Sequence, residues 1–292
     1  MRRRLIIALA QIPLVLAILG LLTFIGGIVG EYVVNRQDPF GESVPSNLTW
    51  LALIGLAVAT AMFLVWFVSV ALLLGVQARR QGPGYGEAYR LIEAFKFEDA
   101  IPLLEQSIEE GKETVDVLML LASAYAYAGR LAEAQKVADR AVALYPETSA
   151  AYVTLSNVYR MQAMYDAAAE VLRHATLLEP ESASNWAELG FMELYAGKES
   201  ASLAAFERAA QQRMPAMYAV RVYYHLAEAY TRSGDARRAA AAAAKMVSSR
   251  DGLASWKSGL EALRGTSYGQ RLAREIEAIE QALGDADASH LD

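Results

Sequence analysis

The chain contains two long stretches without a single charged residue, residues 5–30 and residues 50–76. A helix needs about 20 apolar residues to cross the ~30 Å hydrocarbon layer of a bilayer, because each helical residue rises about 1.5 Å. Inside that layer the backbone must satisfy its own hydrogen bonds, which restricts spanning segments to helices and closed barrels. We therefore expect two transmembrane helices, 5–30 and 50–76, in a membrane anchor of residues 1–80.

A buried core helix or a cleaved signal peptide would fit these stretches less well. A core helix is rarely so long and so free of charge. A signal peptide is suggested for the first stretch by the basic residues Arg2, Arg3 and Arg4. However, the stretch is much longer than the usual apolar region of about 7–15 residues, and no A-x-A cleavage site closes it. A retained anchor is favoured. Small residues at Gly26, Gly30, Gly55 and Ala59 suit close contact between the two helices.

The distribution of basic residues predicts the orientation of the anchor. Loops that carry Lys and Arg stay on the cytoplasmic side. The outer ends of the two apolar stretches carry basic residues, namely Arg2, Arg3, Arg4, Arg79 and Arg80. The loop 31–49 between the stretches holds one base, Arg36, and three acids, Glu31, Asp38 and Glu42. We expect an integral membrane protein with a cytoplasmic N-terminus, a cytoplasmic soluble part and a short loop outside.

Composition excludes several classes of function. The chain has no cysteine, which rules out disulfide scaffolds, thiolate zinc sites and cysteine nucleophiles, and only three histidines. Residues 1–80 carry six Lys and Arg against three acids, whereas residues 81–292 carry 21 against 30. An acidic soluble part without a basic stripe argues against nucleic-acid binding.

After a Gly- and Pro-rich break at 81–86, the sequence repeats itself with a period of 34 residues. Small, aromatic and turn residues recur in phase, with three extra residues near Met214. The copies are marked by Leu121, Tyr125, Gly129, Ala134 and Pro146; Leu155, Tyr159, Ala163, Ala168 and Pro180; Leu189, Gly190, Gly197 and Phe206; and Leu226, Tyr230, Gly234 and Ala239. Apolar residues within each copy are spaced three and four apart, which predicts helices. A weaker copy precedes them, with Ala88, Leu91, Phe97, Ala100 and Leu104.

This pattern resembles the tetratricopeptide repeat (TPR) family. The resemblance implies an all-α fold in which the two transmembrane helices precede a right-handed α-solenoid of antiparallel helix pairs. We expect about five repeats over residues 87–250, a linker at 81–86, and a C-terminal capping helix and tail at 251–292. The tail helix places Leu272, Ile276, Ile279 and Leu283 on one side and charged residues, Glu275 among them, largely on the others. It suits the exposed apolar face of the last repeat.

The resemblance also implies a binding site, because the first helices of such repeats line a concave groove. The groove positions are rich in aromatic and Met residues, with two arginines, and such side chains often dominate binding energy. They are Met119, Ser123, Tyr127, Val153, Asn157, Arg160, Met161, Ala187, Phe191, Leu194, Tyr195, Tyr224, Glu228, Thr231 and Arg232. The alternative is that Tyr127, Phe191 and Tyr195 pack within the superhelix.

No phosphate loop, zinc motif or nucleophile elbow appears, so we expect neither an enzyme nor a cofactor or metal. The expected function is a membrane-anchored scaffold that binds a protein, peptide or partner helix at the membrane surface, as an assembly factor or accessory subunit of a membrane complex. We expect no small-molecule substrate. The alternative is a biogenesis factor of the cytochrome-c-maturation type. That class resembles this chain in architecture only, and it requires the soluble part to lie outside the cytoplasm.

Overall fold

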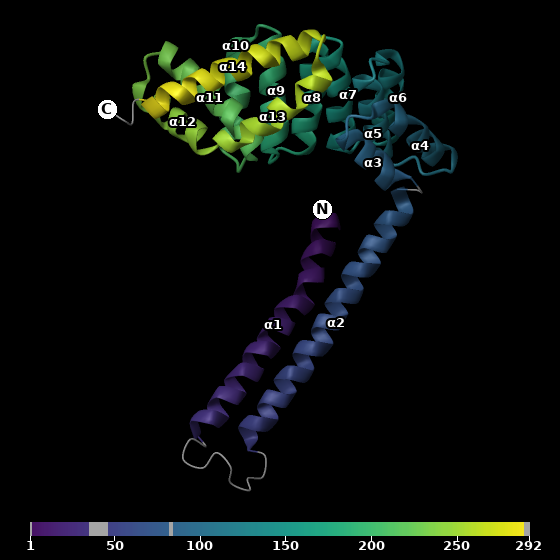
Figure 1. Cartoon of the computed structure of the whole chain (residues 1–292), viewed down its shortest axis with the longest axis vertical. Coiled ribbons are helices and arrows are strands. Elements are labelled where there is room, and N and C mark those ends of the chain that lie inside the picture. Colours follow the sequence, from purple (N-terminus) through teal and green to yellow (C-terminus); the bar gives the residue numbers. More distant parts are fainter. Residues whose placement is uncertain (1, 35–45, 82–83, 289–292) are drawn as a thin grey trace. The chain divides into compact units, whose positions relative to one another are not determined.

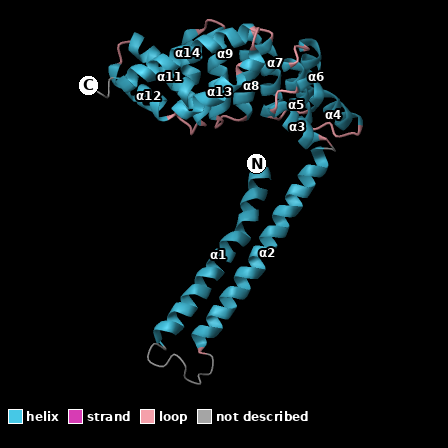
Figure 2. Cartoon of the chain, in the orientation of Figure 1, coloured by secondary structure: helices cyan, strands magenta, loops and turns pink. Residues whose placement is uncertain are grey.

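The computed structural model describes residues 2–34, 46–81 and 84–288 (Figure 1). The chain divides into two compact units, residues 1–80 and 81–292. The described residues form helices and turns, and no strand occurs among them (Figure 2). This confirms the all-α class.

The first unit is a pair of antiparallel helices, α1 (Arg2–Val34) and α2 (Asn47–Gln81), that touch through small residues. A Cβ atom on Gly20 would lie 2.8 Å from the carbonyl oxygen of Gly55, and one on Gly27 would lie 2.8 Å from the Cβ of Ala52. The helices therefore meet where the backbone itself forms the contact surface. The expected close contact occurs at Gly55, at Ala59 and at Gly30, where an added Cβ would lie 3.4 Å from Leu48, whereas Gly26 has nothing within 4 Å.

Both helices are long and apolar enough to cross a membrane. The candidate spans are Gln11–Val34 and Asn47–Leu72, with mean hydropathies of 2.6 and 2.5. Only 17% and 11% of their most apolar windows are buried within the structure. A core helix of a soluble protein would be mostly buried, so this observation argues against a core position for the two helices.

The second unit begins with five antiparallel helix pairs stacked in sequence order. The first members are α3 (Tyr85–Glu93), α5 (Val115–Tyr127), α7 (Ser149–Met161), α9 (Ala183–Tyr195) and α11 (Ala216–Arg232). The second members are α4 (Phe97–Glu109), α6 (Leu131–Leu144), α8 (Tyr165–Leu178), α10 (Glu199–Ala210) and α12 (Ala236–Ser248). Alanines at the close approaches, such as Ala122, Ala134 and Ala168, are fully buried, as close packing of the helices requires.

The third full repeat, α9–α10, departs from the pattern without loosening. Glu193 takes the position that Tyr125 and Tyr159 hold in the two preceding repeats, and it is buried and accepts a hydrogen bond from Arg173. The rings of Phe191 and Phe206 pack at 5.1 Å and fill the space between α9 and α10. Gly190 makes room for this contact, because a Cβ there would lie 2.4 Å from the ring of Phe206.

The turns inside the repeats offer a direct test of backbone strain. Gly129, Gly197 and Gly234 close their first helices with φ of 79°, 79° and 78°, whereas Ala163 occupies the equivalent turn with φ of 58°. The left-handed conformation costs a non-glycine residue about 1–2 kcal/mol. We expect Ala163→Gly to raise the free energy of unfolding by about 0.5–1 kcal/mol, since part of the relief is offset by the backbone entropy of glycine. Urea unfolding followed by circular dichroism measures this change, and Gly129→Ala should lower stability in the same assay. A loss of stability in Ala163→Gly would contradict the expectation.

After α12 the chain turns through three short helices, η1 (Arg250–Gly252), α13 (Leu253–Gly259) and η2 (Glu261–Leu263), into α14 (Ser267–Ala288). The sequence places this last helix over the end of the final repeat. In the structure α14 contacts α12 at that end, but it also crosses the array as far as α7 (yellow in Figure 1). Tyr268, Leu272 and Ile279 of α14 are buried in the same core cluster as Phe191 and Leu226 of the first helices. The helix thus covers the groove side of the array rather than only its end.

Candidate functional site

The expected groove residues divide into three groups in the structure. Ala187 and Phe191 are 0% and 1% exposed, so their side chains belong to the core between the helix pairs. Arg160 is 8% exposed and lies beneath α14. The others keep part of their surface open, namely Met119, Ser123, Tyr127, Val153, Asn157, Met161, Leu194, Tyr195, Tyr224, Glu228, Thr231 and Arg232.

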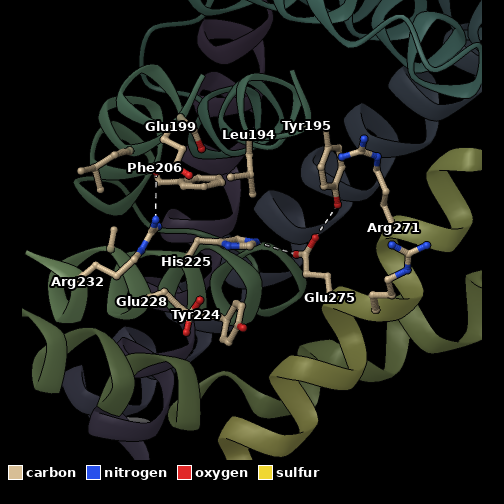
Figure 3. A pocket seen from close by; sticks show the side chains of 14 residues that line it. Leu194, Tyr195, Glu199, Phe206, Tyr224, His225, Glu228, Arg232, Arg271 and Glu275 are labelled. Atoms are coloured by element: carbon tan, nitrogen blue, oxygen red, sulfur yellow. Dashed lines mark hydrogen bonds and ion pairs between the residues drawn. The ribbon is translucent and has the colours of Figure 1, made fainter. Parts of the chain in front are cut away.

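Two hollows gather most of these residues. The smaller, of about 40 Å³, lies between α5 and α7 and includes Ser123, Tyr127, Asn157 and Met161. The larger is an open pocket of about 450 Å³ between α9, α10, α11 and α14 (Figure 3). It brings together Leu194, Tyr195, Tyr224, Glu228 and Arg232 of the expected set with Glu199, Ser202, Leu203, Phe206, His225, Ala229, Arg271, Arg274 and Glu275. Met119, Val153 and Thr231 line neither hollow.

The larger pocket has apolar walls and charged edges. Leu194, Leu203 and Phe206 supply the apolar surface. Arg232 donates to Glu199 at 3.1 Å, so this pair is internally neutralised. Apolar walls with a few oriented polar groups are typical of a site that receives a side chain of a ligand.

A buried ionic cluster fixes α14 beside this pocket. Arg221 is 0% exposed and donates from Nε and Nη2 to the two carboxylate oxygens of Glu275 at 2.6 and 3.0 Å. Tyr195 accepts from Arg221 Nη2 at 3.0 Å and donates to Glu275 at 2.5 Å. His225 Nε2 lies 3.1 Å from the same carboxylate. A bidentate pair of this kind fixes orientation as well as charge.

Two aromatic rings also hold the guanidinium group of Arg221 by stacking. Its guanidinium carbon lies 3.7 Å from the ring centre of Phe191 and 4.2 Å from that of Trp256. Trp256 is held in turn, because its indole N–H donates to the carbonyl oxygen of Met217 at 2.7 Å. Arginine is suited to such a site because its planar cation stacks on aromatic faces while its edge binds a carboxylate.

The ionisation of the cluster follows from these contacts. Burial alone would raise the pKa of Glu275, but Arg221 and His225 outweigh it and hold the pKa well below its ordinary value. Burial, followed by the charge of Glu275, raises the pKa of Tyr195 well above its ordinary value, which keeps the phenol protonated as a donor. The carboxylate is therefore ionised and fully engaged at neutral pH.

A second buried pair lies under the N-terminal end of α14. Arg160 Nη1 donates to Glu188 at 3.1 Å, and Tyr218 donates to the other oxygen of Glu188 at 3.0 Å. The guanidinium of Arg160 also lies 4.6 Å from the ring centre of Tyr268 on α14. The charge of Glu188, with burial as the second cause, raises the pKa of Tyr218.

Seven residues of this arrangement were not expected at the site from the sequence: Glu188, Tyr218, Arg221, His225, Trp256, Tyr268 and Glu275. The expectation that Glu275 lies on a charged outer side of its helix is wrong. The spacing Leu272, Glu275, Ile279 is i, i+3, i+7, which places all three on one helical face, so the pattern already contained the signal. The sequence around Arg221 gave no sign that this residue is buried, because its partner Glu275 is identified only by the tertiary contacts.

Among the residues that the structure describes, no group of three His, Asp or Glu side chains is placed to hold a metal ion.

One family model and several solved structures are similar to parts of this chain. The family model described as tetratricopeptide repeat matches residues 91–155. No curated protein matches the chain in sequence. Among solved structures, a MamA crystal structure is 21% identical, covers 60% of this chain and 98% of its own, and has a TM-score of 0.48. MamA from Desulfovibrio magneticus RS-1 is 20% identical, covers 59% and 97%, and has a TM-score of 0.47. TTC0263, a thermophilic TPR protein in Thermus thermophilus, is 20% identical, covers 66% and 97%, and has a TM-score of 0.46. Residues 91–155, which run from α3 into α7, therefore match the tetratricopeptide repeat, and they follow two candidate membrane spans in the sequence.

Proposed function

We propose that this chain is a membrane-anchored interaction scaffold whose repeats bind a peptide or helix of a protein partner at the membrane surface. The observation that carries the proposal is the outward apolar surface of the first unit. Leu22 is 59% exposed and Leu64 is 56% exposed, so the described residues of the unit leave more than half of each side chain open. Insertion into a lipid bilayer would remove these two apolar helices from water and would leave the repeats in the aqueous phase.

The binding part of the proposal rests on the groove. Its open residues combine aromatic, Met and Arg side chains, and the pocket beside α14 accepts an apolar anchor. A short connection at 81–86 keeps the repeats near the bilayer, because a chain extends by at most about 3.5 Å per residue. Partners are therefore met at the membrane, which suits an assembly factor or accessory subunit of a membrane complex. The role is binding rather than catalysis, without a cofactor.

The orientation follows from the basic residues that flank the hairpin, with the N-terminus and the repeats in the cytoplasm. The absence of cysteine permits a clean test with single-cysteine variants. A membrane-impermeant maleimide should label Ser43→Cys, in the loop between the helices, in intact cells. It should label Ser233→Cys, on an exposed turn of the repeats, only after the membrane is permeabilised.

Two outcomes, one from the labelling and one from carbonate extraction, contradict the proposal. The reverse pattern would place the repeats outside and favour the biogenesis alternative. Release of the protein from membranes by alkaline carbonate would show that the two helices do not anchor it. Carbonate extraction and labelling are therefore performed on the same preparations, with the cysteine-free parent chain as the control for background labelling.

A further inference from the structure

The surface that α14 covers is polar for a surface so deeply buried. Arg160, Glu188 and Arg221 of the first helices are each less than 9% exposed beneath or beside it, and His225 lies at its edge. Burying charges is expensive, and apolar side chains of similar volume often give equal or greater stability. A permanently covered surface therefore has little need of these groups.

The same groups suit a surface that is also exposed to water. With α14 absent, Arg160 keeps its pair with Glu188, which does not involve α14. Arg221 and His225 lose Glu275, but water solvates both of them once they are uncovered. An uncovered apolar floor of the same area would instead favour aggregation.

The covered face of α14 has the pattern of a recognition helix. Tyr268 lies on Arg160, Leu272 and Ile279 are 0% exposed in the core cluster, and Glu275 meets Arg221 between them. These positions recur three and four residues apart along one helical face, and such a face is how an amphipathic helix occupies a groove. A single charged anchor among apolar ones fixes the register of the helix.

The C-terminal end of α14 is held more weakly than its middle. Arg250 pairs with Asp287 and Lys257 pairs with Glu280, and all four side chains are about half exposed. Exposed ion pairs of this kind contribute at most about 1 kcal/mol each. The pocket of about 450 Å³ opens alongside the same helix and exposes Arg271 and Arg274 of α14 to an incoming ligand.

We propose that the surface under α14 is the partner-binding surface of the groove and that α14 occupies it as a resident competitor. The inference rests on the proposed scaffold function and specifies its partner. The partner supplies an amphipathic helix with an aromatic residue, a leucine, a glutamate and an aliphatic residue at the spacing of Tyr268, Leu272, Glu275 and Ile279. Its glutamate replaces Glu275 on Arg221, and its aromatic ring replaces Tyr268 on Arg160.

The test uses the full chain in lipid nanodiscs and a fluorescent synthetic peptide of residues 266–288 as the probe. The chain carries Leu272→Asp and Ile279→Asp in its own α14, which removes the resident competitor. We expect fluorescence anisotropy to show at least tenfold tighter binding of the probe to this variant than to the unaltered chain. The milder variant Glu275→Gln, which leaves the apolar contacts in place, should give an intermediate affinity.

Probe peptides that differ by one substitution test the register of binding without any further change to the chain. Glu275→Gln in the probe should weaken binding at least tenfold, because Arg221 loses its carboxylate. Glu277→Gln, on an exposed position two residues away, should leave binding unchanged. Equal effects of the two changes would overturn the assigned register.

Circular dichroism shows whether each variant keeps its helical array. Absence of probe binding to the folded Glu275→Gln and double-aspartate chains would show that α14 is a fixed part of the fold, and would overturn the inference. A stable dimer that exchanges α14 between copies would assign the surface to a second copy of the chain and also overturn it. Failure of membrane anchoring appears only in the carbonate extraction and labelling experiments, so the two proposals fail separately.

Discussion

Replacing Arg221 by methionine is expected to lower the free energy of unfolding of the repeats by about 3–5 kcal/mol. The change leaves the buried carboxylate of Glu275 without its bidentate partner and removes the cation from between Phe191 and Trp256. The remaining partners, Tyr195 and His225, do not replace a full permanent charge. Urea unfolding of the full chain in a mild detergent, followed by circular dichroism, measures the loss.

Two further variants show whether that loss comes from an uncompensated charge. Replacing Arg221 and Glu275 together by methionine should recover most of the stability, because an apolar pair of similar volume needs no partner. Arg232→Met removes the exposed pair with Glu199, whose side chains are 61% and 69% exposed. It should change stability by less than about 1 kcal/mol. A similar small change for Arg221→Met would mean that the buried cluster does not hold α14.

Truncation of Phe206 to alanine is expected to cost about 3–5 kcal/mol, the range typical of an aromatic side chain removed from a core. Phe206 is 2% exposed and packs on the ring of Phe191 and, at 5.4 Å, on that of His225. Because Gly190 offers no side chain to fill the space, the cavity cannot collapse easily. The same unfolding assay applies.

Leu177→Ala is the matched control for this prediction. Leu177 lies on α8, the second helix of the preceding repeat, and is 76% exposed. Its truncation should change stability by no more than about 0.5 kcal/mol. A loss below about 1 kcal/mol for Phe206→Ala would contradict the role of this ring in filling the space between α9 and α10.

Most of the fold was predictable because repetition multiplies weak local signals. The recurrence of small residues such as Ala134 and Ala168 at one phase of the repeat identified the close approaches, and glycines such as Gly129 identified the turns. Each position alone is common by chance, but four copies in phase are not. The two apolar stretches were equally plain, because length and absence of charge suffice to predict helices that can cross a membrane.

The site was predictable only in part. The resemblance to tetratricopeptide repeats implied groove positions for Leu194, Tyr195, Tyr224, Glu228 and Arg232, and the structure gathers these residues around one pocket. The resemblance implied a groove position for Phe191 as well, yet its ring lies in the core, where it packs on Phe206 in the space that Gly190 leaves open. Spacing fixes the face of a helix, whereas the depth of a side chain depends on what packs above it.

The sequence by itself determined the helices, their pairing within repeats and the division between the apolar hairpin and the acidic repeats. These are local properties, set by periodicity, turn residues and the distribution of charge. The tertiary structure alone decided the course of α14 across the groove, because that course depends on contacts between residues far apart in sequence. Glu275 and Arg221 show the reason: each is an ordinary charged residue in the sequence, and only their meeting in a water-free site makes them a specific pair.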